Sequence, residues 1–224
     1  MQTAIKALCL FLVLSVVAAG ALWLLRIPMA GVYLDRWCDE RALQCEASIT
    51  GLGLGHVSAE GLSIESGGHQ PFAADAVTVR WDWAGAFSPA VRDVVIDRPR
   101  IEAEFDGEAI TLHGLEALVP EGDGDAPLPA ITITDGGLTL TTPAGALEAR
   151  YAADLRDADH GSLRASISPV VLERDDDRIV LDAAALDLAL SAGVPMGEGR
   201  IELAEARLGT FMATDVSGGL TIDD

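Results

Sequence analysis

Histidine, cysteine and clustered aspartate are the residue types in this chain that could bind a metal or take part in catalysis. The histidines, His56, His69, His113 and His160, are far apart and stand beside no cysteine, so no metal-binding template is visible. The run Asp175-Asp176-Asp177 lacks the spaced acids and terminal glutamate of a calcium loop and indicates a solvated turn. No nucleophile elbow, phosphate loop or metalloprotease motif occurs. The sequence therefore predicts no enzyme, no cofactor and no metal site.

The cysteines allow one further kind of chemistry, a disulfide. Cys9 lies in a long apolar run, which leaves Cys38 and Cys45. On one continuous helix, seven residues would separate their Cα atoms by about 10 Å, too far for a bond between the sulfurs. If the helix ends near Arg41 and the chain folds back, the two can bridge in an oxidising compartment. A Cys38–Cys45 disulfide is one prediction, and two free thiols are the alternative.

The N-terminal run Ala7–Leu25 has no charged side chain and is flanked by Lys6 and Arg26. Since about 20 apolar residues cross a bilayer as a helix, residues 1–27 are predicted to be a membrane anchor. The small residues Ala19-Gly20-Ala21 support a cleaved signal peptide as the alternative, but the apolar run continues past them. A cytoplasmic N-terminus would place the remaining chain outside the cytoplasm, which is the periplasm in a Gram-negative bacterium.

The chain after Arg26 is strongly acidic. It holds 13 of the 15 lysine and arginine residues and all 35 acidic residues, a net charge of −22. Such a surface repels nucleic acid and anionic lipid headgroups, so no nucleic-acid partner is expected. Half of the chain is hydrophobic, which argues against disorder. Any bound lipid would have to be held by apolar contact.

Two hydrophobic periods divide the chain after the predicted anchor. Residues 28–44 place apolar side chains between charged ones with a proline near the start, which predicts a short amphipathic helix. From Cys45 onward the period is two, as where Ile101, Ala103 and Phe105 alternate with charged residues. Alternation of this kind predicts half-buried strands.

Turn signals divide these strands into one antiparallel meander. Hairpin turns are predicted at Asp106-Gly107, at Asp135-Gly136-Gly137 and at Pro143-Ala144-Gly145. The acidic segment 121–128 indicates an exposed loop. It separates a first β segment, 45–120, from a second, 129–224, which ends on an unpaired strand. We expect either that this sheet continues beyond the chain end or that an envelope protein covers its edge.

The alternation leaves the predicted sheet with one apolar face, which must be covered by a second layer or a ligand. No later amphipathic helix offers such a layer, and lipid acyl chains are a sufficient cover. The fold class expected is mainly β, with an apolar groove; a closed β-sandwich is the alternative. The predicted groove lining is Ile101, Ala103, Phe105, Ile110, Leu112, Ile131, Ile133, Leu138, Leu140, Leu147, Tyr151, Leu163, Ile167, Leu181, Leu188 and Ile201.

Residues 73–118 resemble a unit near the N-termini of AsmA-like proteins, especially the YdbH and TamB types. The matching positions are Val91, Val94, Ile96, Pro99, Ile101, Gly107, Leu112 and Leu115. The resemblance implies a single-pass inner-membrane protein whose elongated, bent antiparallel sheet lies in the periplasm and carries phospholipid between inner and outer membranes. This chain would be the membrane-proximal portion. The alternative is a non-enzymatic periplasmic assembly module for outer-membrane biogenesis.

Overall fold

The computed structural model describes residues 26–83, 89–115, 129–157, 159–174, 177–191, 194–208 and 211–222. The predicted apolar run Ala7–Leu25 and the predicted acidic loop 121–128 lie outside these residues, as do Asp175 and Asp176 of the predicted acidic turn. Within the described part, no helix has the length and apolar character needed to cross a membrane.

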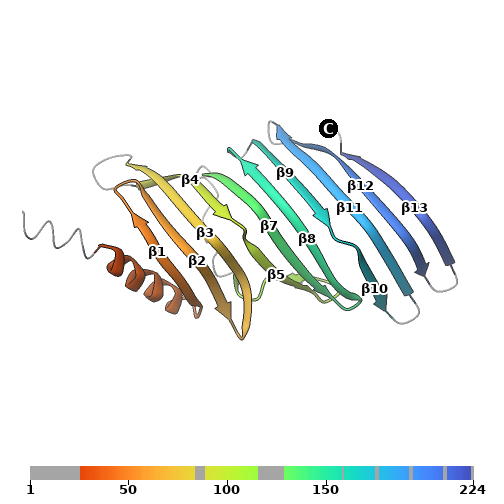
Figure 1. Cartoon of the computed structure of the whole chain (residues 1–224), viewed down its shortest axis with the longest axis horizontal. Helices are drawn as coiled ribbons and strands as arrows, with labels where there is room; N and C mark the ends of the chain where they lie inside the picture. Colours follow the sequence, from red (N-terminus) through yellow and green to blue (C-terminus); the bar gives the residue numbers. More distant parts are fainter. Residues whose placement is uncertain are drawn as a thin grey trace, which may run out of the picture.

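The described chain begins with a helix over residues 26–39, the red-orange coil beside strand β1 (Gln44–Leu52) in Figure 1. The helix ends where Ala42 takes the left-handed conformation, with φ of 55°. There the amides of Arg41 and Leu43 both donate to the carbonyl of Cys38, at 2.9 and 3.0 Å. Such a left-handed residue satisfies the last carbonyls of a helix and reverses the chain.

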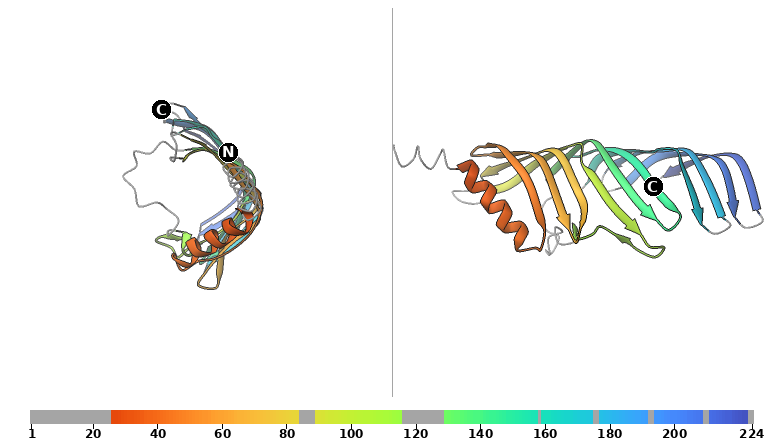
Figure 2. Two further views of the ribbon diagram at one scale, coloured as in Figure 1. Left: turned by 90° about the vertical axis from the view of Figure 1, so that its left-hand side faces the viewer. Right: turned by 60° about the horizontal axis from the view of Figure 1, so that its bottom comes forward.

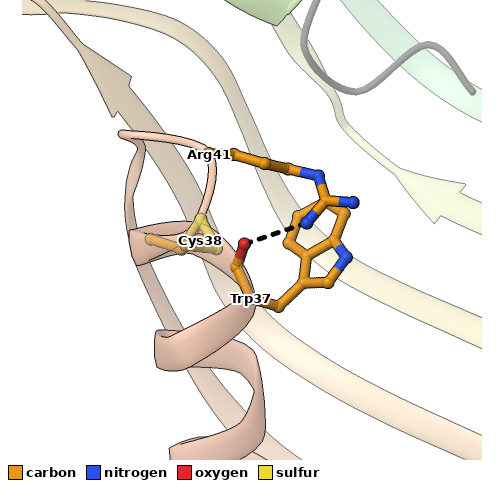
Figure 3. The surroundings of a disulfide bond; sticks show 4 residues. Trp37, Cys38 and Arg41 are labelled. Atoms are coloured by element: carbon orange, nitrogen blue, oxygen red, sulfur yellow. Dashed lines mark hydrogen bonds between the residues drawn. A yellow bond between two sulfur atoms is a disulfide. The ribbon is translucent and has the colours of Figure 1, made fainter.

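This reversal brings Cys38 and Cys45 together as a disulfide, with Cα atoms 6.1 Å apart (Figure 3). Cys38 is 1% exposed and forms a small buried core with Leu43 and Ile64. The partly buried residues packed on this core are Leu34, Trp37, Cys45, Leu62 and Phe72. The helix is thus joined to the first strands by a covalent bond and by apolar packing.

Arg41 packs on Trp37 beside this junction. Its guanidinium carbon lies 4.1 Å from the centroid of the Trp37 ring, and its Nη1 donates to the Trp37 carbonyl at 3.2 Å (Figure 3). The guanidinium therefore stacks on the aromatic ring while it satisfies a carbonyl near the end of the helix.

All thirteen described strands belong to one sheet, with the main order β1-β2-β3-β4-β7-β8-β9-β11-β12-β13. The strands after β1 are β2 His56–Ser66, β3 His69–Trp83, β4 Pro89–Asp97, β5 Arg100–Phe105, β6 Ile110–Thr111, β7 Ala130–Thr142, β8 Gly145–Leu155, β9 His160–Ile167, β10 Val170–Arg174, β11 Asp177–Ser191, β12 Val194–Leu208 and β13 Phe211–Ile222. Viewed along its long axis, the sheet forms an arc open on one side (Figure 2). The mainly β prediction is confirmed, and the described strands form no second sheet of a sandwich.

The sheet is mixed, so the prediction of a purely antiparallel sheet was wrong. Strands β4 and β5 both pair antiparallel with β3 and act as two halves of one strand broken at Arg98-Pro99. Strand β7 pairs parallel with both halves. A parallel neighbour requires a return connection, which the chain between Phe105 and Ala130 makes. Period-two alternation does not encode strand direction, which explains the error.

A line of left-handed residues crosses the sheet at this break. Gly61 in β2, Arg98 after β4 and Asp135 in β7 have φ of 63°, 46° and 51°. Strand β7 carries an extra residue relative to β8 at this point, and β2 carries one relative to β1. These are β-bulges, which bend a strand and shift its side-chain alternation by one.

The segment Asp135-Gly136-Gly137 was predicted to be a hairpin turn, and that prediction was wrong. Strand β7 runs through it without reversing. Aspartate and glycine tolerate the left-handed conformation in turns and bulges alike, so the sequence signal is the same for both. By contrast, Asp106-Gly107 does turn the chain between β5 and β6, where the Asp106 carboxylate accepts the amides of Glu108 and Ala109 at 2.8 and 2.9 Å.

Polar contacts tie neighbouring strands together along the bulge line. The Asp75 carboxylate in β3 meets Arg98 at 2.8 Å and Arg100 at 3.1 Å. The Thr134 hydroxyl in β7 donates to Asp97 at 2.7 Å. Each contact is at least partly exposed and contributes little by itself, but together they link β3, β4, β5 and β7 at the position where their registers must match.

We expect the disulfide to be detectable by alkylation followed by intact-mass measurement. Without reductant, Cys9 alone should be labelled, and after reduction all three cysteines should be. Replacing Cys38 and Cys45 by serine should lower the free energy of unfolding by about 2 kcal/mol, because the unfolded chain loses a short covalent loop. The control Cys9→Ser should leave that free energy unchanged. Labelling of Cys38 and Cys45 in unreduced protein would contradict the disulfide.

Candidate functional site

Cross-strand pairing aligns apolar residues from one end of the sheet to the other. Residues directly opposite in paired strands point to the same face, so a succession of pairs forms a row. The first row is Cys45, Ile64, Phe72, Ile101, Leu138, Ala149, Ile167, Ala184, Ile201 and Gly218. It reaches from β1 to β13 and contains no charged residue.

Three further rows run beside the first. The second row is Ile49, Ala59, Val77, Ile96, Ile133, Ala153, Leu163, Leu188, Gly197 and Ile222. The third row is Leu52, Val57, Val79, Val94, Ile131, Leu155, Gly161 and Leu190. A shorter middle row, between the first and second, is Gly136, Tyr151, Ala165, Leu186 and Gly199. We call these four rows the apolar face.

The bulge line keeps these rows on one side of the sheet. In β7, Ile133 and Leu138 are five residues apart, a spacing that would put them on opposite faces of a regular strand. The extra residue at Asp135 restores them to the same face. Arg98 does the same for Ile96 and Ile101. Without these bulges the first row and the second row would face opposite ways.

The other face of the sheet is polar and exposed. In β8, Leu147 to Leu155 are half-buried at every second position, while Glu148, Arg150, Ala152 and Asp154 between them are exposed. Cross-strand partners on this face pair their charges, as where Arg164 meets Asp187 at 3.1 Å. This face therefore carries the acidic surface of the protein into water.

All of the predicted lining residues are described, and most belong to the apolar face. Its rows contain Ile101, Ile131, Ile133, Leu138, Tyr151, Leu163, Ile167, Leu188 and Ile201. Ala103, Leu140 and Leu147 form a short additional row, Phe105 pairs with Ile110, and Leu181 pairs with Leu203. Leu112 follows β6 outside any strand, and Ile110 is 63% exposed.

The predicted groove lining did not include the residues that extend the apolar face over β2, β3 and β4. These are Val57, Ala59, Val77, Val79, Val94 and Ile96. The signal was present in Val77-Thr78-Val79-Arg80, which alternates like the strands that were named. Only the pairing register shows that they continue the rows of the second half of the sheet.

The apolar face is covered at one end. The helix over residues 26–39 packs on Ile64 and Phe72, next to β1. Along the first row, exposure accordingly rises from 6% at Ile64 to 44% at Ile201. The part of the face over β7 to β12 mixes leucine and isoleucine with small residues, including Ala149, Ala153 and Ala165.

Tyr151 places a hydroxyl group in the middle of the apolar face. Its ring lies over Gly136, where a Cβ atom would come 2.6 Å from the ring carbon Cζ. The hydroxyl is buried and has no hydrogen-bond partner among the described residues. Burial raises the pKa of the phenol above its ordinary value of 10.0. The sequence analysis named this residue for its place in the alternation and gave no reason for its polar atom.

An open depression of about 950 Å³ has a different, charged lining. Arg150, Arg164 and Arg200 stand around it together with Asp187 and Glu198. Of the predicted lining residues, Tyr151 alone borders it. Arg164 and Asp187 pair across this lining at 3.1 Å, and Ala165 and Leu186 border it as well, so the depression combines charged and apolar groups.

Two histidines that the sequence places far apart come together in the structure. The rings of His69 and His113 stack with centroids 4.0 Å apart, and His113 Nε2 lies 3.3 Å from a carboxylate oxygen of Glu104. This contact holds the turn after β6 against the start of β3. Among the residues that the structure describes, no group of three or more histidine, cysteine, aspartate or glutamate side chains is arranged to hold a metal ion.

Comparison with known families gives one match. A family model described as YdbH-like, intermembrane phospholipid transport protein YdbH, matches residues 13–209. The match spans β1 to β12 and so contains nearly all of the apolar face. It confirms the resemblance drawn from residues 73–118. No curated protein matches the chain.

We expect Tyr151 to ionise late in a spectrophotometric titration. The chain has two tyrosines, so the difference between the protein and its Tyr151→Phe variant isolates this phenol. Since burial disfavours the phenolate, the difference curve should have its midpoint above pH 10, the ordinary value for tyrosine. A midpoint at or below that value would show that the phenol is solvated.

The same shift predicts the direction of a pH effect on stability. The unfolded chain loses the phenolic proton at about pH 10 and the folded chain at higher pH. The contribution of Tyr151 to the free energy of unfolding is therefore present below that pH and is lost as the pH rises through the raised pKa. Measured by urea unfolding above pH 10, the free energy of unfolding should therefore fall less in the Tyr151→Phe variant than in the unchanged protein.

Proposed function

The chain belongs to the YdbH-like family of intermembrane phospholipid transport proteins, and from this premise we propose that the apolar face holds the acyl chains of phospholipid. The observation that supports this most directly is the continuity of the four rows. Lipid can move from one position to the next only if no charged side chain interrupts the path, because an acyl chain gains nothing from contact with charge. The first row meets this requirement from β1 to β13.

In this proposal the apolar face lines the inside of the arc that Figure 2 shows. Side chains on the inner side of a curved sheet converge and shield one another, which agrees with the half-buried alternation in β8 and β9. Ala149, Ala153 and Ala165 give an acyl chain room beside the larger leucines and isoleucines. The headgroup remains in water at the open side of the arc.

We further propose that Ala7–Leu25 anchors the protein in the inner membrane, with the sheet in the periplasm as the membrane-proximal part of a path to the outer membrane. Three observations support this location. The run is long and apolar enough for a span, the Cys38–Cys45 disulfide requires an oxidising compartment, and the sheet extends away from the helix along its long axis (Figure 1). In this role the protein is not an enzyme.

An assembly module is the second candidate, and the last strand favours it. Strand β13 pairs only with β12 among the described strands, and its Phe211, Met212 and Val216 are 63%, 59% and 39% exposed. An exposed edge with apolar side chains is a surface that another chain can extend. We propose that an envelope protein docks here, either in addition to lipid transport or in place of it.

Neighbouring alanines in β8 provide a matched test of the lipid proposal. Ala153→Glu puts a carboxylate on the apolar face, opposite Ile133 and Leu163. Ala152→Glu puts the same carboxylate on the exposed face, opposite Arg164. We expect Ala153→Glu to lose most of the phospholipid that co-purifies with the full-length protein, because a charge there repels acyl chains. Ala152→Glu should retain it. Solvent extraction followed by mass spectrometry measures the lipid.

Strand β11 offers an independent pair, since Ala184 belongs to the first row and Ala185 lies on the exposed face. Ala184→Glu should lose lipid and Ala185→Glu should not. Circular dichroism and urea unfolding verify that each variant is folded before lipid is compared. If folded protein carries no phospholipid, or if both variants of each pair lose it equally, the apolar face is not the lipid site. The assembly module is then the better-supported function.

The membrane location has its own test. If Ala7–Leu25 is retained as an anchor, the protein should begin at Met1 or Gln2 and stay in the membrane fraction through carbonate washing, which removes only electrostatic contacts. Protease added to spheroplasts should then reach the domain after Arg26. A mature chain that begins near Leu22 and is freely soluble would instead make the protein a periplasmic carrier.

A further inference from the structure

The helix over residues 26–39 has a second apolar surface that does not touch the sheet. Met29, Val32 and Tyr33 are 61%, 68% and 72% exposed. Their spacing of three and four residues places them side by side on one face of the helix. The side that packs on the sheet is formed by Leu34, Trp37 and Cys38. The first two turns therefore carry an exposed apolar stripe, and the residues that pack on the sheet follow it in the later turns.

Charge is segregated along this helix. Residues 27–34 contain no charged side chain, whereas Asp35, Arg36, Asp39 and Glu40 follow in the last turns and the reversal, all exposed. Arg36 and Glu40 pair with each other at 3.1 Å. The exposed apolar stripe thus lies at the end of the helix that directly follows the run Ala7–Leu25, and the charged part lies at the far end.

We propose that the first two turns of this helix lie in the interface of a zwitterionic phospholipid bilayer, with Met29, Val32 and Tyr33 directed towards the acyl chains. The inference rests on the proposed function, because the bilayer in question is the one that Ala7–Leu25 enters. A chain that leaves a bilayer at Leu25 has residues 26–33 within about 12 Å of that point as helix. Tyrosine is favoured at the membrane interface, where its ring is buried and its hydroxyl stays hydrated.

The chemistry of the surface selects the kind of lipid. The chain after Arg26 carries a net charge of −22, which repels anionic headgroups. The stripe itself offers apolar contact without basic residues between 27 and 35. Binding should therefore need no anionic lipid and should be insensitive to salt.

The consequence concerns the start of the lipid path. The Cys38–Cys45 disulfide fixes the end of the helix to β1, and Cys45 begins the first row of the apolar face. A helix held at a set depth in the interface therefore holds the first strand at the membrane surface. Lipid leaving the bilayer meets the apolar face where the helix does not cover it.

The test uses the full chain reconstituted into phosphatidylcholine vesicles whose acyl chains carry bromine near the headgroup, which quenches nearby tryptophan. The variant Tyr33→Trp adds a reporter on the stripe, and Asp39→Trp adds one at the exposed far end of the same helix. Subtracting the emission of the unchanged protein removes the contribution of the four native tryptophans. We expect the added emission of Tyr33→Trp to lose most of its intensity and that of Asp39→Trp to keep most of it, at low and high salt alike.

A second substitution tests the cause. Val32→Asp, introduced into Tyr33→Trp, should restore much of the lost emission, because Val32 is exposed and its replacement disturbs the membrane contact and not the sheet. Equal quenching of the two reporters, or none at position 33, would overturn the proposal. If the emission of the tryptophan added at position 33 instead depends on protein concentration, the stripe contacts a second copy of the chain and not the bilayer. Phospholipid carried by the apolar face is measured in the same preparation, so failure of this inference is distinguished from failure of the proposed function.

Discussion

The structure depends on one constraint: apolar side chains on many strands must point to the same side of a single sheet. A strand contributes to such a surface only if its register places its apolar residues opposite those of its neighbours. In β2, β4 to β5 and β7 the sequence alternation slips by one residue partway along, and a left-handed residue at Gly61, Arg98 or Asp135 absorbs each slip. The bulges at Arg98 and Asp135 lie in adjacent strands, and Gly61 lies on the far side of β3, so pairing continues across the line.

The two ends of the sheet differ in how deeply the apolar residues are buried. At the β1 end, the helix, the disulfide and the cluster around Cys38 and Ile64 bury the apolar face and fix its boundary. At the other end, Ile201 and the residues of β13 stay exposed. A sandwich would bury both ends alike.

Charge and apolar contact are separated across the thickness of one sheet. Every second residue of β8 and β9 is exposed, and Arg164 on this side pairs across strands with Asp187. The intervening residues are apolar and often small. The high negative charge therefore repels anionic surfaces, while the opposite face is available to an uncharged chain. The unpaired hydroxyl of Tyr151 is the one feature of that face that apolar contact does not explain.

The sequence by itself determined that the protein is mainly β, that one face is apolar, and that Cys38 and Cys45 can meet if the helix ends between them, because side-chain alternation and helix termination are local properties. The spacing of apolar residues around Pro99 also indicated the family to which the chain belongs. Tertiary structure decided which strands are neighbours, that β7 runs parallel to β4 and β5, and that Asp135-Gly136-Gly137 is a bulge. Direction and pairing depend on backbone hydrogen bonds between distant segments, and every residue except proline offers the same donor and acceptor, so no local pattern records the choice.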